Sequence, residues 1–309
     1  MLDPQARALL DLMIANGVPP VEQLQPPQAR QLYRDRRAFS QPDPLPLHEV
    51  RDMLAGGVPV RLYRPAPVQP GQPRPVLVYL HGGGWVIGDC DTHDVLCREL
   101  ALGAGCEVVS VDYRMGPEHP FPAAVDDCVA VTRWVREQAP VLGLDAARIA
   151  VGGDSAGGNL AAVVCLALRE AGEPLPAFQL LIYPATDMRA VAPSHTANGQ
   201  GYLLTHEAMM WYRGHYVPEA AQWSDWRASP LLAASHAGLP PALVLTAGYD
   251  PLRDEGRQYA DALSAAGVPC QYVCFERQIH GFVPMGRMID EAHTAVALCA
   301  AALRRALRA

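Results

Sequence analysis

The sequence contains no lysine, and all 25 of its basic residues are arginine. This absence excludes the chemistries that need a lysine amine, namely Schiff-base catalysis, P-loop and kinase phosphate binding, and serine–lysine dyads. Positive charge is also in the minority, because 32 acidic residues give the chain a formal net charge of −7. No large basic patch can be assembled from this composition, so we expect no nucleic-acid partner.

Long hydrophobic runs are missing as well. No uncharged apolar run reaches the roughly 18 residues of a membrane-spanning helix, so we expect no membrane partner. The first residues, MLDPQARALLDLM, lack a basic segment followed by an apolar core, which predicts a cytoplasmic protein without an export signal.

The eight cysteines show neither a CxxC nor a metal-ligand spacing. Cys270 and Cys274 lie on a predicted strand, roughly 13 Å apart by strand rise, which is too far for a disulfide. We therefore expect reduced, mostly buried thiols. The zinc-hydrolase spacings HExxH and HxxEH are also absent, so we expect no metal and no cofactor.

The N-terminal region, residues 1–46, reads as two short helices with a proline-rich exit. Asp3 is a suitable N-cap with Pro4 at the first helical position, and Gly17 is placed to end the helix. A second amphipathic stretch runs from Pro27 to about Phe39. Helices this short need another surface to pack on.

From about residue 47, short apolar strands alternate with helical stretches, which predicts an α/β protein with a mostly parallel sheet buried on both faces. The expected strands are 48–53, 58–64, 76–80, 108–111, 149–151, 180–183, 243–245 and 272–275, and the clearest helices are 123–138, 156–171, 253–266 and 290–309.

One long insertion interrupts this alternation. Nearly sixty residues separate the strand ending at Tyr183 from the strand beginning at Leu243, where a crossover needs only about a dozen. The segment is rich in tyrosine and tryptophan between Tyr202 and Trp226. A long aromatic excursion of this kind usually covers a functional site.

The pentapeptide GDSAG at residues 153–157 lies between the apolar run Ile149–Val151 and a stretch of small residues. This is the GxSxG nucleophile elbow in the strand-to-helix context that it requires. Glycines flank the serine because so tight a turn leaves no room for a Cβ atom. The pattern predicts that Ser155 is a nucleophile, with the helix N-terminus behind it favouring developing negative charge.

The segment HGGGW at residues 81–85 follows the predicted strand Val76–Leu80. Three consecutive glycines let successive N–H groups point at one spot, which is typical of an oxyanion hole. A phosphate cradle is disfavoured because neither GxGxxG nor a P-loop lysine occurs. We interpret His81 as a brace for this loop rather than as a base.

A serine nucleophile needs a base and an orienting carboxylate, which in this arrangement follow later in the chain. Asp250 is the first carboxylate after the strand at 243–245, and Asp254 is its rival on the following helix. His280 lies beside a glycine in the loop after the last strand, whereas His293 lies in or next to the following helical stretch. The sequence therefore predicts Ser155, Asp250 and His280 as the catalytic residues.

Five motifs in order resemble the bacterial hormone-sensitive-lipase-like esterases, the family IV type with the GDSAG variant, within the α/β-hydrolase superfamily. They are HGGGW at 81–85, DYR at 112–114 followed by PEHPFPAA, GDSAGGNLAA at 153–162, YDPLRDEG at 249–256 and IHGF at 279–282. The resemblance covers nearly the whole chain. It implies a central sheet of about eight strands flanked by helices, a helical cap and cofactor-free hydrolysis of short- to medium-chain esters.

The resemblance also implies roles for individual residues. The same nucleophile, acid and base are carried over, and the oxyanion donors become the backbone N–H groups of Gly83, Gly84 and Ala156. Gly82 shapes the loop and is included among the substrate-binding residues. Trp85 either borders the pocket or packs beneath it.

The cap implied by the resemblance consists of residues 1–46 and 188–227, and the catalytic core consists of 47–187 and 228–309. Within the cap, Trp211 and Tyr212 either line the substrate pocket or attach the cap to the core, as buried aromatics commonly do. The resemblance further implies a homodimer through an edge strand, here the one near 272–275.

The alternatives to a carboxylesterase use the same fold. An amidase or arylamide deacylase would employ the same triad, because both reactions pass through an acyl-serine. A non-catalytic ligand receptor is disfavoured, since such receptors characteristically lose the histidine that is present here as His280. A long-chain lipase is disfavoured because no extended apolar lid is evident.

Overall fold

The computed structural model describes residues 1–308. Its centre is an eight-stranded sheet with the order β1-β2-β4-β3-β5-β6-β7-β8. Strand β2 is antiparallel to both of its neighbours, and the other pairings are parallel. The strands are β1 (Glu49–Ala55), β2 (Val58–Arg64), β3 (Arg74–Leu80), β4 (Glu107–Val111), β5 (Leu144–Asp154), β6 (Phe178–Ile182), β7 (Ala242–Tyr249) and β8 (Cys270–Ile279). The predicted mostly parallel sheet is confirmed.

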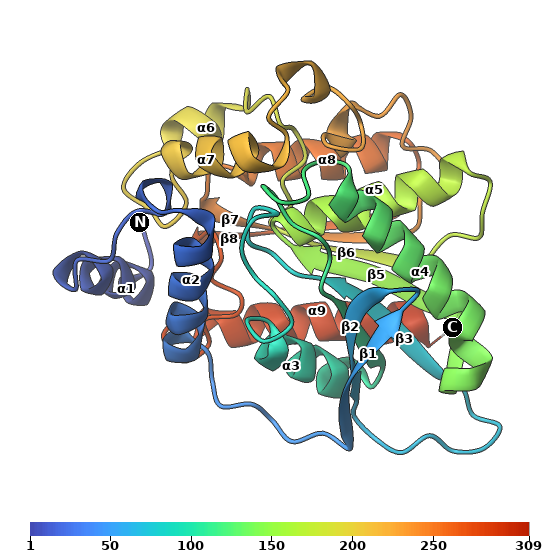
Figure 1. The fold of residues 1–309 in the computed structure, drawn as a ribbon. Helices are drawn as coiled ribbons and strands as arrows, with labels where there is room; N and C mark the ends of the chain where they lie inside the picture. Colours follow the sequence, from blue (N-terminus) through green and yellow to red (C-terminus); the bar gives the residue numbers. More distant parts are fainter. Residues whose placement is uncertain (309) are drawn as a thin grey trace.

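Helices cover both faces of this sheet, as Figure 1 shows. One face carries α3 and α9, and the other carries α4, α5 and α8. The helices are α1 (Pro4–Ala15), α2 (Pro26–Ser40), α3 (Asp94–Ala104), α4 (Ala123–Leu142), α5 (Ala156–Glu170), α6 (Pro193–Ala197), α7 (His206–Tyr216), α8 (Arg253–Ala265) and α9 (Glu291–Leu307). Helices α3, α6 and α7 have no counterpart among the helices that were predicted by residue range.

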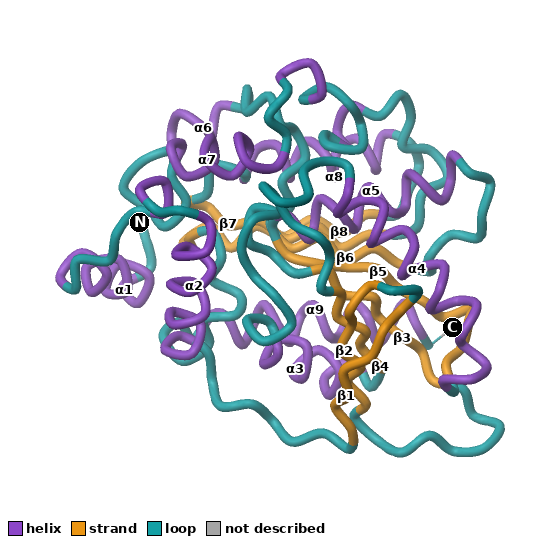
Figure 2. The backbone as a smooth tube through the Cα atoms, in the orientation of Figure 1, coloured by secondary structure: helices purple, strands orange, loops and turns teal. Residues whose placement is uncertain are grey.

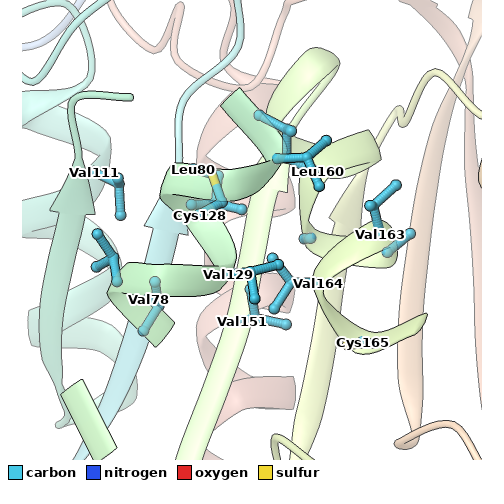
Figure 3. Close-up of a cluster of buried hydrophobic side chains, with 14 of the residues drawn as sticks. Val78, Leu80, Val111, Cys128, Val129, Val151, Leu160, Val163, Val164 and Cys165 are labelled. Atoms are coloured by element: carbon cyan, nitrogen blue, oxygen red, sulfur yellow. The ribbon is translucent and has the colours of Figure 1, made fainter. Parts of the chain in front are cut away.

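The core forms because the central strands are apolar on both sides. In β3, Val76, Val78 and Leu80 point to the α4–α5 face, while Leu77 and Tyr79 point to the α3–α9 face. Figure 3 shows the first of these layers, in which Val78 and Leu80 share a cluster with side chains of α4, such as Cys128, and of α5, such as Leu160. This packing fixes the strand ends from which the site loops emerge.

The N-terminal helices begin as the sequence predicts. The Asp3 carboxylate accepts hydrogen bonds from the N–H groups of Gln5 and Ala6, with Pro4 following it. Helix α2 also starts with a proline, at Pro26. Figure 2 shows α1 and α2 lying outside the sheet and its flanking helices, near α6 and α7 of the insertion. None of the helices in the described part of the chain combines the length and hydrophobicity that a membrane span requires.

Candidate active site

The residues singled out in the sequence gather at the carboxyl edge of the parallel strands. HGGG follows β3, Ser155 follows β5, Asp250 follows β7 and His280 follows β8. Because parallel strands end at the same edge of a sheet, residues far apart in the chain meet there.

Ser155 is held on a strained turn. Its backbone φ of 56° is in the left-handed region, and its N–H donates to the Ile182 carbonyl at 2.8 Å. A Cβ atom at Gly153 or at Gly157 would overlap the Leu80 carbonyl oxygen. The turn therefore needs both glycines, and it presents the serine hydroxyl at the start of α5.

A hydrogen-bonded chain leads from the serine to a buried carboxylate. His280 Nε2 lies 2.9 Å from Ser155 Oγ, and His280 Nδ1 lies 2.7 Å from Asp250 Oδ2. The other oxygen of Asp250 accepts the Leu252 N–H at 2.8 Å. A carboxylate only accepts, so Nδ1 carries the hydrogen and Nε2 offers its lone pair to the serine.

The rival carboxylate points elsewhere. Asp254 lies on α8, where its oxygens accept hydrogen bonds from Arg253 and from the Ser194 N–H. The structure thus brings Asp250, and not Asp254, to His280.

The glycine loop after β3 adopts backbone conformations that favour glycine, with φ of 121° at Gly83 and 60° at Gly84. Within residues 1–308, the N–H groups of Gly83, Gly84 and Ala156 donate to no hydrogen-bond acceptor of the protein. Gly82 differs, because its N–H donates to Asp154 Oδ1 at 2.9 Å. The free donors belong to the three residues predicted for the oxyanion hole.

Asp154 connects the glycine loop after β3 to the turn that carries Ser155. The same Oδ1 atom accepts the Tyr79 hydroxyl at 2.7 Å, and His93 Nε2 lies 3.3 Å away. Burial opposes the charge of Asp154, but the charge of His93 and the hydrogen bonds outweigh it and lower the pKa of this carboxyl. Asp154 is therefore a fixed anion, and it fastens Gly82 to the residue before the nucleophile.

His81 behaves as a brace. Its Nδ1 donates to the Gly82 carbonyl at 2.9 Å, and its ring stacks on Tyr113 at 4.3 Å between centroids. Burial and, secondarily, the charge of His93 lower the pKa of His81 to about 4. A neutral imidazole that is used to hold the loop agrees with its interpretation from sequence.

A cavity of about 690 Å³ opens over Ser155 and His280. Part of its wall comes from the sheet, its flanking helices and their loops, which we call the body. The rest comes from residues 1–46 and 188–227, which we call the cover. Arginines of α2 join the two, since Arg30 pairs with Glu118 and Arg34 with Asp89.

The four residues assigned to substrate binding divide into two pairs. Trp85 and Tyr212 line the cavity, and the Tyr212 ring lies where a Cβ atom at Gly84 would be. Gly82 and Trp211 are not among its lining residues. Trp211 instead packs edge-on against Tyr212 and His215, with centroid distances of 5.1 and 4.5 Å.

Sequence reasoning missed the contacts that join α6 to the loop carrying Asp250. The Asn198 amide donates to the carbonyls of Gly248 and Asp250 at 3.2 and 3.1 Å. Ser194 Oγ accepts the Asp254 N–H at 3.1 Å, while Asp254 caps the Ser194 N–H at 2.9 Å. Each helix N-terminus is therefore capped by a side chain of the other.

A second histidine–carboxylate pair also lines the cavity. His195 Nε2 lies 2.5 Å from Glu255 Oε2, and Glu255 Oε1 accepts the Thr186 N–H at 2.6 Å. Burial raises the pKa of Glu255. Neither His195 nor Glu255 was assigned a role from the sequence, where the only local feature is that Glu255 directly follows the acidic Asp254. Within residues 1–308 no group of three or more metal-binding side chains is placed to hold an ion.

Comparison with known proteins agrees with this geometry. The family described as alpha/beta hydrolase fold matches residues 77–284, more than half of the chain. The carboxylic ester hydrolase LipN of Mycobacterium tuberculosis is 48% identical over 235 residues, which are 74% of this chain and 62% of LipN. Carboxylesterase NlhH of the same species is 43% identical over 285 residues, covering 89% of this chain and 88% of NlhH.

Two further likenesses extend over whole chains. The ethyl acetate hydrolase of Pseudomonas putida is 38% identical and covers 99% of both sequences. The solved structure of the ester hydrolase EH1AB1 from the Lake Arreo metagenome has a TM-score of 0.95, 47% identity and 99% coverage of both chains. The chain therefore belongs to the α/β-hydrolase fold family, and within it to the bacterial hormone-sensitive-lipase-like esterases, which are carboxylic ester hydrolases.

Proposed function

We propose that the protein hydrolyses short- to medium-chain carboxylic esters through an acyl-serine, with Ser155 as nucleophile, His280 as base and Asp250 as the orienting acid. The observation that carries this proposal is the unbroken chain of hydrogen bonds from Ser155 Oγ through His280 to Asp250, at 2.9 and 2.7 Å. Nucleophile, base and orienting group in this geometry define serine hydrolase chemistry.

In the proposed reaction, His280 Nε2 takes the proton of Ser155 as its oxygen attacks the ester carbonyl. The negative charge that develops on the carbonyl oxygen is stabilised by the N–H groups of Gly83, Gly84 and Ala156. His280 then returns the proton to the departing alcohol, and water repeats the sequence on the acyl-enzyme. Asp250 holds the imidazole tautomer and stabilises the imidazolium.

An amidase reaction would use the same groups and differ only in the leaving group. The ester reaction is preferred because relatives that match most of this chain carry ester-hydrolase names. A non-catalytic receptor fits poorly, because His280 is present and lies within hydrogen-bond distance of Ser155.

The cover is the proposed cap, composed of residues 1–46 and 188–227, over a core of 47–187 and 228–309. Trp85 and Tyr212 then border the substrate, since both line the cavity. Trp211 does not line the cavity and supports Tyr212 through their edge-on contact.

The proposed setting is the cytoplasm, supported by eight cysteines that are all unpaired thiols. A homodimer through β8 is also part of the proposal. β8 is an edge strand of the sheet, so its outer backbone groups are available for pairing with a second copy.

The test is hydrolysis of p-nitrophenyl acetate, butyrate, hexanoate, octanoate and palmitate by the wild type and by Ser155→Ala. We expect an optimum at short to medium chains and a loss of kcat of about ten-thousandfold or more in the variant. Circular dichroism checks that the variant is folded. Equal rates in the two proteins would refute Ser155 as nucleophile, and a wild type active only on anilides would favour the amidase.

A further inference from the structure

One face of helix α2 carries three arginines, at positions 30, 34 and 37. This spacing places them in one row directed at the body. The first two have carboxylate partners, because Arg30 binds Glu118 at 2.6 Å and Arg34 binds Asp89 at 2.6 Å. Arg37 has none, since no ion pair within residues 1–308 includes it. The row therefore ends in an unmatched positive charge.

Arg37 is also the buried member of the row. Its side chain is only 5% exposed, and its Nε and Nη1 atoms have no hydrogen-bond partner in the described part of the chain. The remaining nitrogen, Nη2, donates to the Tyr33 hydroxyl, and the guanidinium lies over the Tyr33 ring. A guanidinium stays protonated at any ordinary pH, so this is a charge and not a neutral group.

The location of this charge is the wall of the catalytic cavity. Arg37 lines the same space as Ser155 and His280. The body carboxylate that acts on it electrostatically is Asp154, but that group lies beyond ion-pair distance and already accepts from Tyr79 and Gly82. Within residues 1–308, Arg37 therefore keeps two buried donors without a partner, Nε and Nη1, in the wall of the cavity that also contains Ser155.

A buried charge without a partner is unfavourable, and charged groups that are held in such surroundings in a cleft are candidates for a functional site. We infer that Arg37 forms a carboxylate-binding subsite, and that the preferred substrates are short esters that also carry a free carboxylate group. Each planar fork of a guanidinium pairs Nη2 with Nε or with Nη1, and Nη2 keeps a second N–H besides the one that it donates to Tyr33. A carboxylate can therefore still accept two parallel hydrogen bonds from Arg37. This inference rests on the esterase function proposed above and specifies its substrate class.

The carboxylate can belong to either half of the ester, and two substrate pairs separate these cases. p-Nitrophenyl hydrogen adipate and p-nitrophenyl hexanoate have acyl chains of equal length, and only the first is charged. p-Acetoxybenzoate and its methyl ester place the charge on the alcohol side instead. For each pair, the ratio of kcat/KM for the charged ester to that for the neutral ester is measured, after subtraction of spontaneous hydrolysis.

We expect Arg37→Met to lower this ratio about tenfold to a hundredfold for at least one pair, because it removes a charge-assisted hydrogen bond. Arg37→Lys keeps the charge but loses the fork, so its ratio falls between those of the wild type and Arg37→Met. Arg34→Met is the matched control, since it removes an arginine of the same row whose partner is outside the cavity, and its ratios stay at the wild-type values.

Ratios within twofold of the wild type for both pairs in Arg37→Met would overturn the inference. If Arg37 only balanced the charge of Asp154, the variant would slow charged and neutral esters equally, and the ratio would not move. Should Arg37→Met fail to fold, the Arg37→Lys ratio decides, and a wild-type ratio in it overturns the inference.

Calorimetric titration measures carboxylate binding without ester hydrolysis, so it tests the subsite independently of the proposed function. Adipate is titrated into Ser155→Ala and into the double variant Ser155→Ala/Arg37→Met. Binding to the first that weakens tenfold or more in the second supports the subsite even if no ester is hydrolysed. Equal binding to both proteins overturns the subsite and leaves the esterase proposal standing if p-nitrophenyl hexanoate is hydrolysed.

Discussion

The body and the cover enclose the same cavity but are organised by different kinds of contact. In the body, each proposed catalytic group directly follows a strand of the sheet. Short backbone contacts hold two of them, as the Leu252 N–H binds Asp250 and the Ile182 carbonyl at the end of the neighbouring β6 binds Ser155. The cover contributes mainly apolar side chains, and it reaches the body through a few polar contacts. The catalytic groups are thus placed by the regular strands of the sheet, whereas the shape of the substrate space is set by helices and loops outside it.

This difference predicts that substitutions in the body mainly lower kcat and that substitutions in the cover mainly change substrate preference. Residues of the cover that touch the catalytic loops should fall between the two. Three substitutions test this ordering at increasing distance from the reacting atoms.

The largest effect is expected in the body, at Gly82. A Cβ atom there would overlap the Asp154 carboxylate and its backbone oxygen, so Gly82→Ala must displace the loop that carries the free N–H groups. Because misplacing one oxyanion donor costs about a hundredfold to a thousandfold in rate, kcat should fall by that factor. Steady-state kinetics on p-nitrophenyl butyrate measures it.

Gly172→Ala is the matched control for this substitution. Gly172 has a φ of 66° but nothing within reach of a new Cβ atom, so the change strains the backbone without moving a neighbour. It should cost roughly 1–2 kcal/mol of stability and leave kcat at the wild-type value. A Gly82→Ala variant as active as Gly172→Ala would show that the loop does not depend on its tie to Asp154.

The sequence predicts the body in more detail than the cover. The body motifs define their own geometry, because a GxSxG sequence after a strand requires one tight turn. The mostly parallel sheet is present as predicted, and Ser155, His280 and Asp250 lie within hydrogen-bond distance of one another in that order. Even the choice of Asp250 over Asp254 followed from its position directly after β7.

The cover could not be predicted to this depth, because no motif at a strand end marks its contacts. Asn198 reaches the carbonyl of Asp250 across 52 residues, and nothing in the local pattern around either residue records that pairing. Likewise Trp211 and Tyr212 are adjacent aromatics in one helix, so composition treats them alike. Only the packing of α7 decides that Tyr212 faces the cavity and Trp211 does not.

An intermediate effect is expected at Asn198, the residue of the cover that holds the acid loop. Asn198→Ala removes the amide that donates to the carbonyls of Gly248 and Asp250, so the carboxylate of Asp250 loses part of its support. We expect kcat to fall about tenfold with KM within about twofold of the wild type, because an interaction that orients the base matters most in the transition state.

The control for Asn198 is Gln179→Met. The Gln179 amide is also buried and donates to a backbone carbonyl, that of Pro240, but far from the catalytic loops. Both variants should lose about 1 kcal/mol of stability, measured by urea unfolding, and only Asn198→Ala should lose kcat. Equal kinetic losses would mean that kcat follows general stability, and the cover would then have no specific hold on Asp250.

The smallest effect on kcat is expected for the ring of Tyr212, which closes the cavity over Gly84. Tyr212→Ala vacates space beside the proposed oxyanion loop without removing a catalytic group, so kcat/KM should shift toward longer acyl chains. Burial of one methylene is worth about 0.8 kcal/mol, which corresponds to about fourfold in kcat/KM for each methylene that the new space accepts. The profile from butyrate to octanoate measures the shift.

Trp211→Ala sharpens this last test because the two aromatic residues are neighbours in α7. Trp211 contacts Tyr212 edge-on, packs against the cluster of Ala29, Val86 and Ile87, and is not a lining residue of the cavity. Its loss should therefore lower stability while the chain-length optimum stays where it is in the wild type. If both variants shift the optimum equally, the boundary of the cavity is set by the position of the whole helix and not by one ring. If neither variant shifts the optimum, the acyl chain lies along another wall of the cavity, and the residues of α1 and α2 that line it become the candidates for setting chain-length preference.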